Sequence, residues 1–146
     1  MRAEYFAALT AVCWSVGSLF EKKGVKLGGL APVMGVGVRT AVSLVLLAAF
    51  SYPYWGQLRT AGAKSLLLVA FGGGVLAGAV GVVCLYAGLK TGNLSTVMTI
   101  AFCSTPVFGA VLGVAVLKEK LSLLQVLGIV MCVGGAALTV LCKRPA

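Results

Sequence analysis

Two uncharged runs in the C-terminal half constrain the fold of this chain more than any other feature. Leu94–Leu117 comprises 24 residues and Leu121–Cys142 comprises 22, and neither contains a charged side chain. A helix needs about 20 apolar residues, at ~1.5 Å each, to cross the hydrocarbon core of a bilayer. Because only Lys118–Lys120 separates the two runs, the helices must be antiparallel neighbours. The sequence therefore predicts a transmembrane hairpin.

The composition of the whole chain agrees with a membrane protein. Of 146 residues, 60% are hydrophobic and 10% are charged, whereas a soluble domain carries about 25% charged residues. The net charge of +9 does not indicate nucleic-acid binding, because the basic residues lie between the apolar runs. In that position they anchor helix ends against anionic lipid headgroups.

Five apolar runs predict an all-α integral membrane fold with five transmembrane helices. The expected helices cover residues 4–21, 31–52, 65–89, 94–117 and 121–142. We expect residues 1–146 to form one domain, with a polar linker at Gly56–Lys64. Tyr52, Tyr54 and Trp55 are expected to form an aromatic belt at the membrane interface.

Local motifs add detail to three of these helices. Ser122 and Gln125 form an S-x-x-Q capping box that fixes the start of the last helix. Pro106 lies inside the preceding helix and removes the donor for the carbonyl of Phe102, which neighbouring hydroxyl or thiol groups must then satisfy. Gly74 and Gly78 form a G-x-x-x-G motif, which predicts close helix packing in the bundle or between subunits.

The hairpin also carries a recognisable pattern. A proline in mid-helix is followed by E-x-L-x-x-x-Q-x-x-G, and this arrangement resembles the EamA domain of the drug/metabolite transporter superfamily. The residues that match are Pro106, Glu119, Leu121, Gln125 and Gly128, with Gly134 and Gly135 beyond them. A weaker match to Trp14 and Arg39 extends the resemblance over essentially the whole chain. It implies a transporter of small metabolites rather than an enzyme.

Polar groups at membrane depth are the candidates for a substrate pathway. Arg39 is the one charge well inside a predicted helix, and its burial in lipid costs ~2.5–3.5 kcal/mol on insertion scales. Its function is either to bind an anionic or carboxylate-bearing group of a substrate or to gate by pairing. Structurally, it either snorkels to the interface or is bound by carbonyl groups, with Glu21 as a candidate partner. Trp14, Ser18 and Glu21 recur on one face of the first helix. The predicted pathway residues are Trp14, Ser18, Arg39, Ser43, Tyr86, Thr99, Cys103 and Pro106.

Catalytic, metal and cofactor sites are not predicted. The chain has no His, no pair of intramembrane carboxylates and no base beside a Ser or Thr. The five cysteines are dispersed through apolar segments without C-x-x-C spacing, which favours a packing role. We therefore expect no enzyme activity and no cofactor.

The distribution of basic residues does not select an orientation. With five crossings, one side of the membrane carries Arg2, Arg59, Lys64, Lys118 and Lys120, and the other carries Lys22, Lys23, Lys26, Lys90, Lys143 and Arg144. The positive-inside rule needs a larger asymmetry than five against six. The chain either inserts in both orientations and forms an antiparallel dimer, or inserts one way with the cytoplasmic N-terminus that the resemblance implies.

A dimer is expected in both cases, because five helices are half of the ten typical of full-length superfamily members. The resemblance implies a secondary transporter in the inner (plasma) membrane that exports a small solute by alternating access. The alternatives are a lipid-linked sugar flippase subunit, a small multidrug-type efflux protein, and a non-transporting scaffold or accessory subunit.

One departure from the superfamily bears on the substrate. Small multidrug exporters of this superfamily carry an essential Glu in the middle of their first helix, where this chain has Val12–Ser15. We place Glu4 and Glu21 at the ends of that helix. The central charge is then positive, which favours a neutral, zwitterionic or anionic solute over a lipophilic cation.

Overall fold

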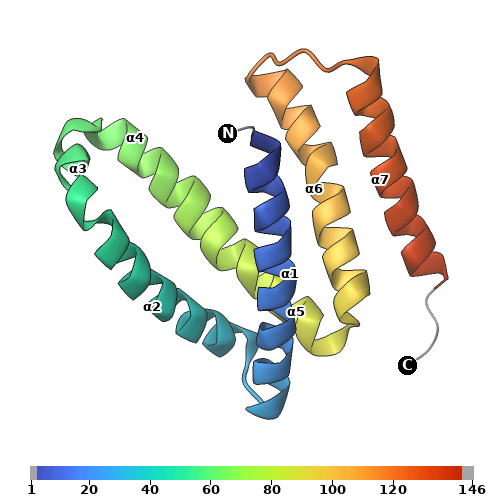
Figure 1. The fold of residues 1–146 in the computed structure, drawn as a ribbon, viewed down its shortest axis with the longest axis horizontal. Coiled ribbons are helices and arrows are strands. Elements are labelled where there is room, and N and C mark those ends of the chain that lie inside the picture. Colours follow the sequence, from blue (N-terminus) through green and yellow to red (C-terminus); the bar gives the residue numbers. More distant parts are fainter. Residues whose placement is uncertain (1–2, 143–146) are drawn as a thin grey trace. The chain divides into compact units, whose positions relative to one another are not determined.

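The computed structural model describes residues 3–142, and this range is helical with short connections (Figure 1). Arg2, Lys143 and Arg144, which enter the charge count above, lie outside the described residues. The chain divides into two compact units after Thr91.

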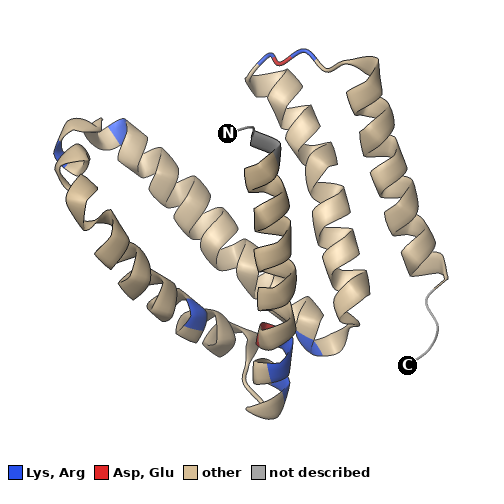
Figure 2. Ribbon diagram, in the orientation of Figure 1, with Lys and Arg blue, Asp and Glu red and all other residues tan. Residues whose placement is uncertain are grey.

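The first unit contains three long helical segments joined by short turns. Its elements are α1 (Ala3–Leu27), α2 (Pro32–Ser51), η1 (Tyr52–Tyr54), α3 (Gly56–Thr60), α4 (Gly62–Leu68), η2 (Val69–Gly81) and α5 (Val82–Thr91). The predicted polar linker at Gly56–Lys64 is mostly helical, because α3 and the start of α4 cover it. Figure 2 shows that the basic residues lie mostly at helix ends and in turns.

The first helix is longer than predicted. It runs to Leu27 instead of ending at residue 21, because lysines propagate a helix well and the first stop signal is a pair of glycines. Gly29 has φ +57°, and the N–H of Leu30 donates to the carbonyl of Val25 at 3.1 Å. This Schellman-type end places Glu21 inside α1, which corrects its expected terminal position.

The third long segment changes its helical form in the middle. Residues 62–91 are continuous, but Val69–Gly81 is a π-helix rather than an α-helix. A Cβ on Gly74 would meet nothing within 4 Å, and one on Gly78 would meet only the carbonyl of Gly73. Within the described residues of the first unit, then, no neighbouring helix packs on the G-x-x-x-G face, and the role of this face in helix packing stays a prediction.

The core of the first unit is formed where α1, α2 and α5 meet. Val25, Val36, Val82 and Tyr86 are the buried residues of this cluster. A Cβ on Gly35 would lie 2.7 Å from a ring carbon of Tyr86, so α2 approaches the tyrosine ring at a distance that only glycine allows. Lys90 closes the same end by donating to the carbonyl of Leu30 at 2.9 Å.

The second unit is the predicted hairpin, formed by α6 (Leu94–Val116) and α7 (Leu123–Leu141). The capping box is confirmed: Gln125 N–H donates to the Ser122 hydroxyl at 3.2 Å, and Ser122 N–H donates to the Gln125 side chain at 2.8 Å. Pro106 lies inside α6, and the hydroxyl of Thr105 donates to the carbonyl of Ala101 at 2.7 Å. This hydroxyl binds the carbonyl one residue before Phe102, so satisfaction of the Phe102 carbonyl by a neighbouring hydroxyl or thiol stays a prediction.

Four helical segments within residues 3–142 are long and apolar enough to cross a membrane. They are Pro32–Tyr54, Gly62–Thr91, Leu94–Val116 and Leu123–Leu141. The predicted fifth span, α1, is not among them. The physical difference lies in its last third, where Glu21, Lys22, Lys23 and Lys26 replace apolar residues.

Candidate functional site

The candidate site is built around an ion pair between α1 and α2. Arg39 Nε lies 3.0 Å from Glu21 Oε1, and the two side chains are 33% and 19% exposed. The extension of α1 beyond residue 21 places this carboxylate opposite Arg39. Because each charge partly compensates the other, the pair lowers the cost of placing Arg39 in a membrane span.

An aromatic ring and a small polar residue complete one side of the pair. The guanidinium carbon of Arg39 lies 5.5 Å from the centroid of the Trp14 ring, a cation–π arrangement. Trp14, Glu21 and the buried Ser18 line one cavity of about 240 Å³ together with Arg39. Trp14, Ser18 and Glu21 therefore share one face of α1, as predicted, and this face lines one cavity.

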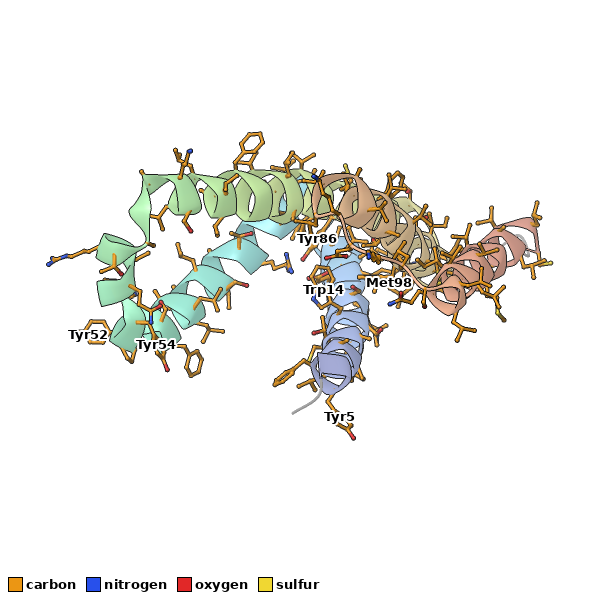
Figure 3. The ribbon with its side chains drawn as sticks, turned by 90° about the horizontal axis from the view of Figure 1, so that it is seen from above. Tyr5, Trp14, Tyr52, Tyr54, Tyr86 and Met98 are labelled. Carbon is orange, nitrogen blue, oxygen red and sulfur yellow. The ribbon has the colours of Figure 1, made fainter. Side chains whose placement is uncertain are left out.

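Tyr86 forms the other side of the pair. Its ring is buried, and its phenol lies near the carboxylate of Glu21. A second cavity, of about 190 Å³, is lined by Tyr86, Arg39 and Glu21. Trp14 and Tyr86 are labelled in Figure 3, and Tyr52 and Tyr54 lie away from them beyond the far end of α2. We call Trp14, Ser18, Glu21, Arg39 and Tyr86 the charged cluster.

The remaining predicted residues are placed elsewhere. Ser43 lies one turn further along α2 and is half-buried. Thr99, Cys103 and Pro106 belong to α6 in the second unit, where the thiol of Cys103 lies near that of Cys132. Four of the eight predicted pathway residues therefore come together in the charged cluster, and a common pathway for all eight stays a prediction.

Glu21 is the member of the charged cluster that we expected at a helix end and left out of the predicted pathway. It continues the spacing of Trp14 and Ser18 at i+7 and i+3, and the ion pair confirms it as the partner of Arg39 that we considered. Its expected position at the end of the helix kept it out of the pathway. Reading the Gly28–Gly29 pair as the stop signal would have moved Glu21 to the interior of the helix.

The geometry of the charged cluster suits binding of a polar solute. Within residues 3–142, no group of three or more His, Cys, Asp or Glu side chains could hold a metal ion. The charged cluster offers a guanidinium, a carboxylate, a phenol and an indole to two small cavities. This set can recognise charge and hydrogen-bonding groups on a small molecule.

Taken together, the fold and the charged cluster define a multi-pass, α-helical membrane protein. The EamA-like transporter family matches residues 1–141, so the chain belongs to this family. Its members are transporters of the drug/metabolite type rather than enzymes. No curated protein and no solved structure matches the chain significantly.

Proposed function

We propose that this protein is a secondary transporter that exports a small metabolite across the inner (plasma) membrane by alternating access. Membership of the EamA-like family supports transport. The proposal includes α1 as a fifth crossing, because its 25 residues are about 37 Å long at ~1.5 Å per residue. Its terminal lysines can extend toward the headgroups while their methylene chains stay in apolar surroundings.

The observation that carries the proposal is the Glu21–Arg39 pair between two cavities. A carboxylate on the solute would compete with Glu21 for the guanidinium of Arg39. Its binding would separate α1 from α2 at this point, and its release would let the pair re-form. This competition favours anionic or zwitterionic solutes, and neutral solutes can bind by hydrogen bonds to Tyr86 and Ser18.

We further propose that the functional unit is a homodimer, parallel or antiparallel. The charged cluster uses α1, α2 and α5, and all three belong to one unit of a short chain. Alternating access needs a second body against which the first can move. A second copy supplies that body and doubles the number of helices around the solute.

Trp14 provides a direct test, because it contacts Arg39 and the chain has only one other tryptophan, Trp55. In a Trp55→Phe background, quenching of Trp14 would be titrated with acetate, glycine, glucose and tetramethylammonium. We expect acetate or glycine to quench, Arg39→Ala to abolish the effect and Arg39→Lys to weaken it. Glu21→Gln should raise the affinity for carboxylates by removing the competitor.

Transport itself is measured by uptake of the same solutes into proteoliposomes. Unchanged affinity for carboxylates in Arg39→Ala, or quenching by tetramethylammonium alone, would contradict the proposal.

A non-transporting scaffold is the second candidate function, because Arg39 is already neutralised by Glu21 within one unit. In that case the pair only holds α1 against α2. A Glu21→Leu/Arg39→Leu double variant would then retain assembly and all cellular activity. We expect it to retain assembly but to lose solute binding, which separates the two functions.

A further inference from the structure

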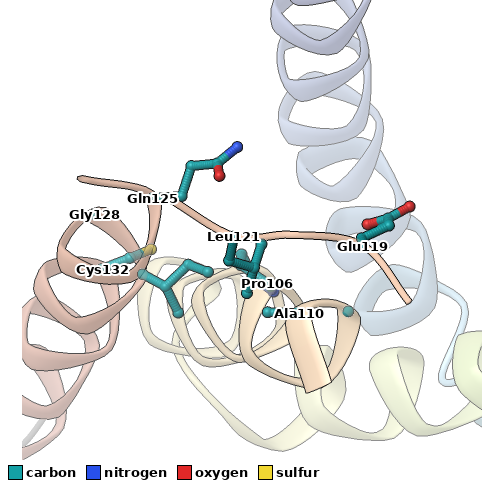
Figure 4. Close-up of a pocket in the computed structure, with 9 residues that line it drawn as sticks. Pro106, Ala110, Glu119, Leu121, Gln125, Gly128 and Cys132 are labelled. Carbon is teal, nitrogen blue, oxygen red and sulfur yellow. The ribbon is translucent and has the colours of Figure 1, made fainter. Parts of the chain in front are cut away.

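The hairpin of the second unit contains an open groove that the charged cluster does not use. Its volume is about 510 Å³, and it extends from the loop between α6 and α7 to Pro106 and Cys132 (Figure 4). Its lining includes Gly109, Ala110 and Gly128, whose small size leaves space between the two helices. In a bilayer, an apolar groove of this kind between two spans is open to lipid chains.

The carboxylate of Glu119 lies at the loop end of this groove, next to Gly113. The backbone N–H of Glu119 donates to the carbonyl of Gly113 at 3.0 Å, after Lys118 has turned the chain with φ 56°. Glu119 Oε2 lies 2.8 Å from the position that a Cβ on Gly113 would occupy. Within residues 3–142 no basic side chain pairs with this carboxylate, so it can bind a cation from outside the chain.

Donors flank the carboxylate. Gln125 commits its side-chain oxygen to the backbone N–H of Ser122, which leaves its amide nitrogen as a donor. Glu119 and Gln125 extend to the same side of the loop in Figure 4. Lys118 precedes Glu119 in the sequence and Lys120 follows it, and Figure 2 shows this basic–acidic–basic order in the loop.

We propose that this groove binds a phospholipid with a primary ammonium headgroup, such as phosphatidylethanolamine. One acyl chain would lie along Gly109 and Gly128, the ammonium would bind Glu119, and the phosphate would accept from Gln125 and the flanking lysines. A primary ammonium donates three charge-assisted hydrogen bonds. A choline headgroup has no N–H donor, and a glycerol headgroup has no cation for Glu119.

Native mass spectrometry of the full chain tests this proposal. The protein is mixed in detergent with equimolar phosphatidylethanolamine, phosphatidylcholine and phosphatidylglycerol before it is released from the detergent in the instrument. We expect phosphatidylethanolamine adducts to exceed phosphatidylcholine adducts by about tenfold, because only the former satisfies the carboxylate. Glu119→Gln should abolish this preference, and Glu119→Asp should retain part of it.

Two glycines of α7 provide a matched pair for the acyl-chain part of the site. Gly128 lines the groove and Gly134 does not, and a Cβ at either position would meet nothing within 4 Å. Both leucine substitutions should therefore fold. Gly128→Leu fills the groove and should remove the bound phosphatidylethanolamine, whereas Gly134→Leu should leave it unchanged.

Three results would overturn the proposal. Equal retention of the three lipids would show that the groove does not select a headgroup. Preference for phosphatidylglycerol would show that the lysines act without Glu119. Loss of a dimer in Gly128→Leu, with phosphatidylethanolamine still bound, would show that a second copy of the chain occupies the groove.

Discussion

At the scale of single residues, the Glu21–Arg39 pair joins α1 to α2 and has a proposed role in solute binding. Removing one partner leaves the other charge uncompensated in a span, which costs more than removing both. We expect Glu21→Gln and Arg39→Gln each to lower the free energy of unfolding by about 2 kcal/mol. The double variant should recover at least half of that loss, as measured by thermal or denaturant unfolding in detergent. Additive losses in this double-mutant cycle would show that the two side chains are not coupled.

Gly35 gives a second prediction at this scale. Alanine at this position would bring its Cβ within 2.7 Å of the buried Tyr86 ring, and a rigid ring in a core cannot move aside. We expect Gly35→Ala to destabilise the protein by about 1–3 kcal/mol. Gly37→Ala in the same helix is the control, since its Cβ would meet nothing within 4 Å. It should be neutral or stabilising by up to about 1 kcal/mol.

The sequence was most informative where one residue type has one physical requirement. Arg39 stood out because a charge in an apolar span needs a partner, and the Ser122–Gln125 capping box followed from its spacing. The partner of Arg39 remained open because it depends on where α1 ends. The groove beside Pro106 was not predictable, because its opening depends on how α6 and α7 pack rather than on either sequence run alone.

At the scale of elements, η2 is the feature that hydropathy could not predict. An uncharged run of this length indicates a span but does not select i→i+4 or i→i+5 hydrogen bonding. The π-form is rare and occurs mostly as single-turn bulges inside α-helices, frequently at functional sites. Here it precedes α5, which carries Tyr86 of the charged cluster. The helical form of η2 therefore sets the rotation and height at which Tyr86 meets Glu21.

Gly78→Ala tests this element. Its Cβ would lie 2.7 Å from the carbonyl oxygen of Gly73, five residues earlier, and should convert the segment toward an α-helix. Because an α-helix has fewer residues per turn than a π-helix, the segment should lengthen. Spin labels at Ser65 and Lys90, in a background without native cysteines, should report a longer separation in Gly78→Ala. Gly74→Ala, with open space around its Cβ, should leave the separation unchanged.

At the scale of the whole molecule, the number of crossings decides how the ends of the chain are placed. Five crossings put the two ends on opposite sides of the membrane, and four put them on the same side. We expect a membrane-impermeant maleimide to label only one of two single cysteines, placed near either end, in intact cells. Labelling of both positions in full, or of neither, would remove α1 from the spans. Partial labelling of both positions would indicate insertion in two orientations.

The close packing of the Tyr86 ring against Gly35 restricts how α2 and α5 can move relative to each other. Two helices in contact at such a short distance cannot slide past each other without clashing, so α2 and α5 must be displaced as a single body. In the proposed mechanism, a solute that separates Arg39 from Glu21 would therefore move α5 together with α2. The nearest backbone able to absorb that displacement is the glycine run Gly72–Gly74 in η2, before α5. The flexibility of this run should therefore limit the rate of the proposed transport cycle.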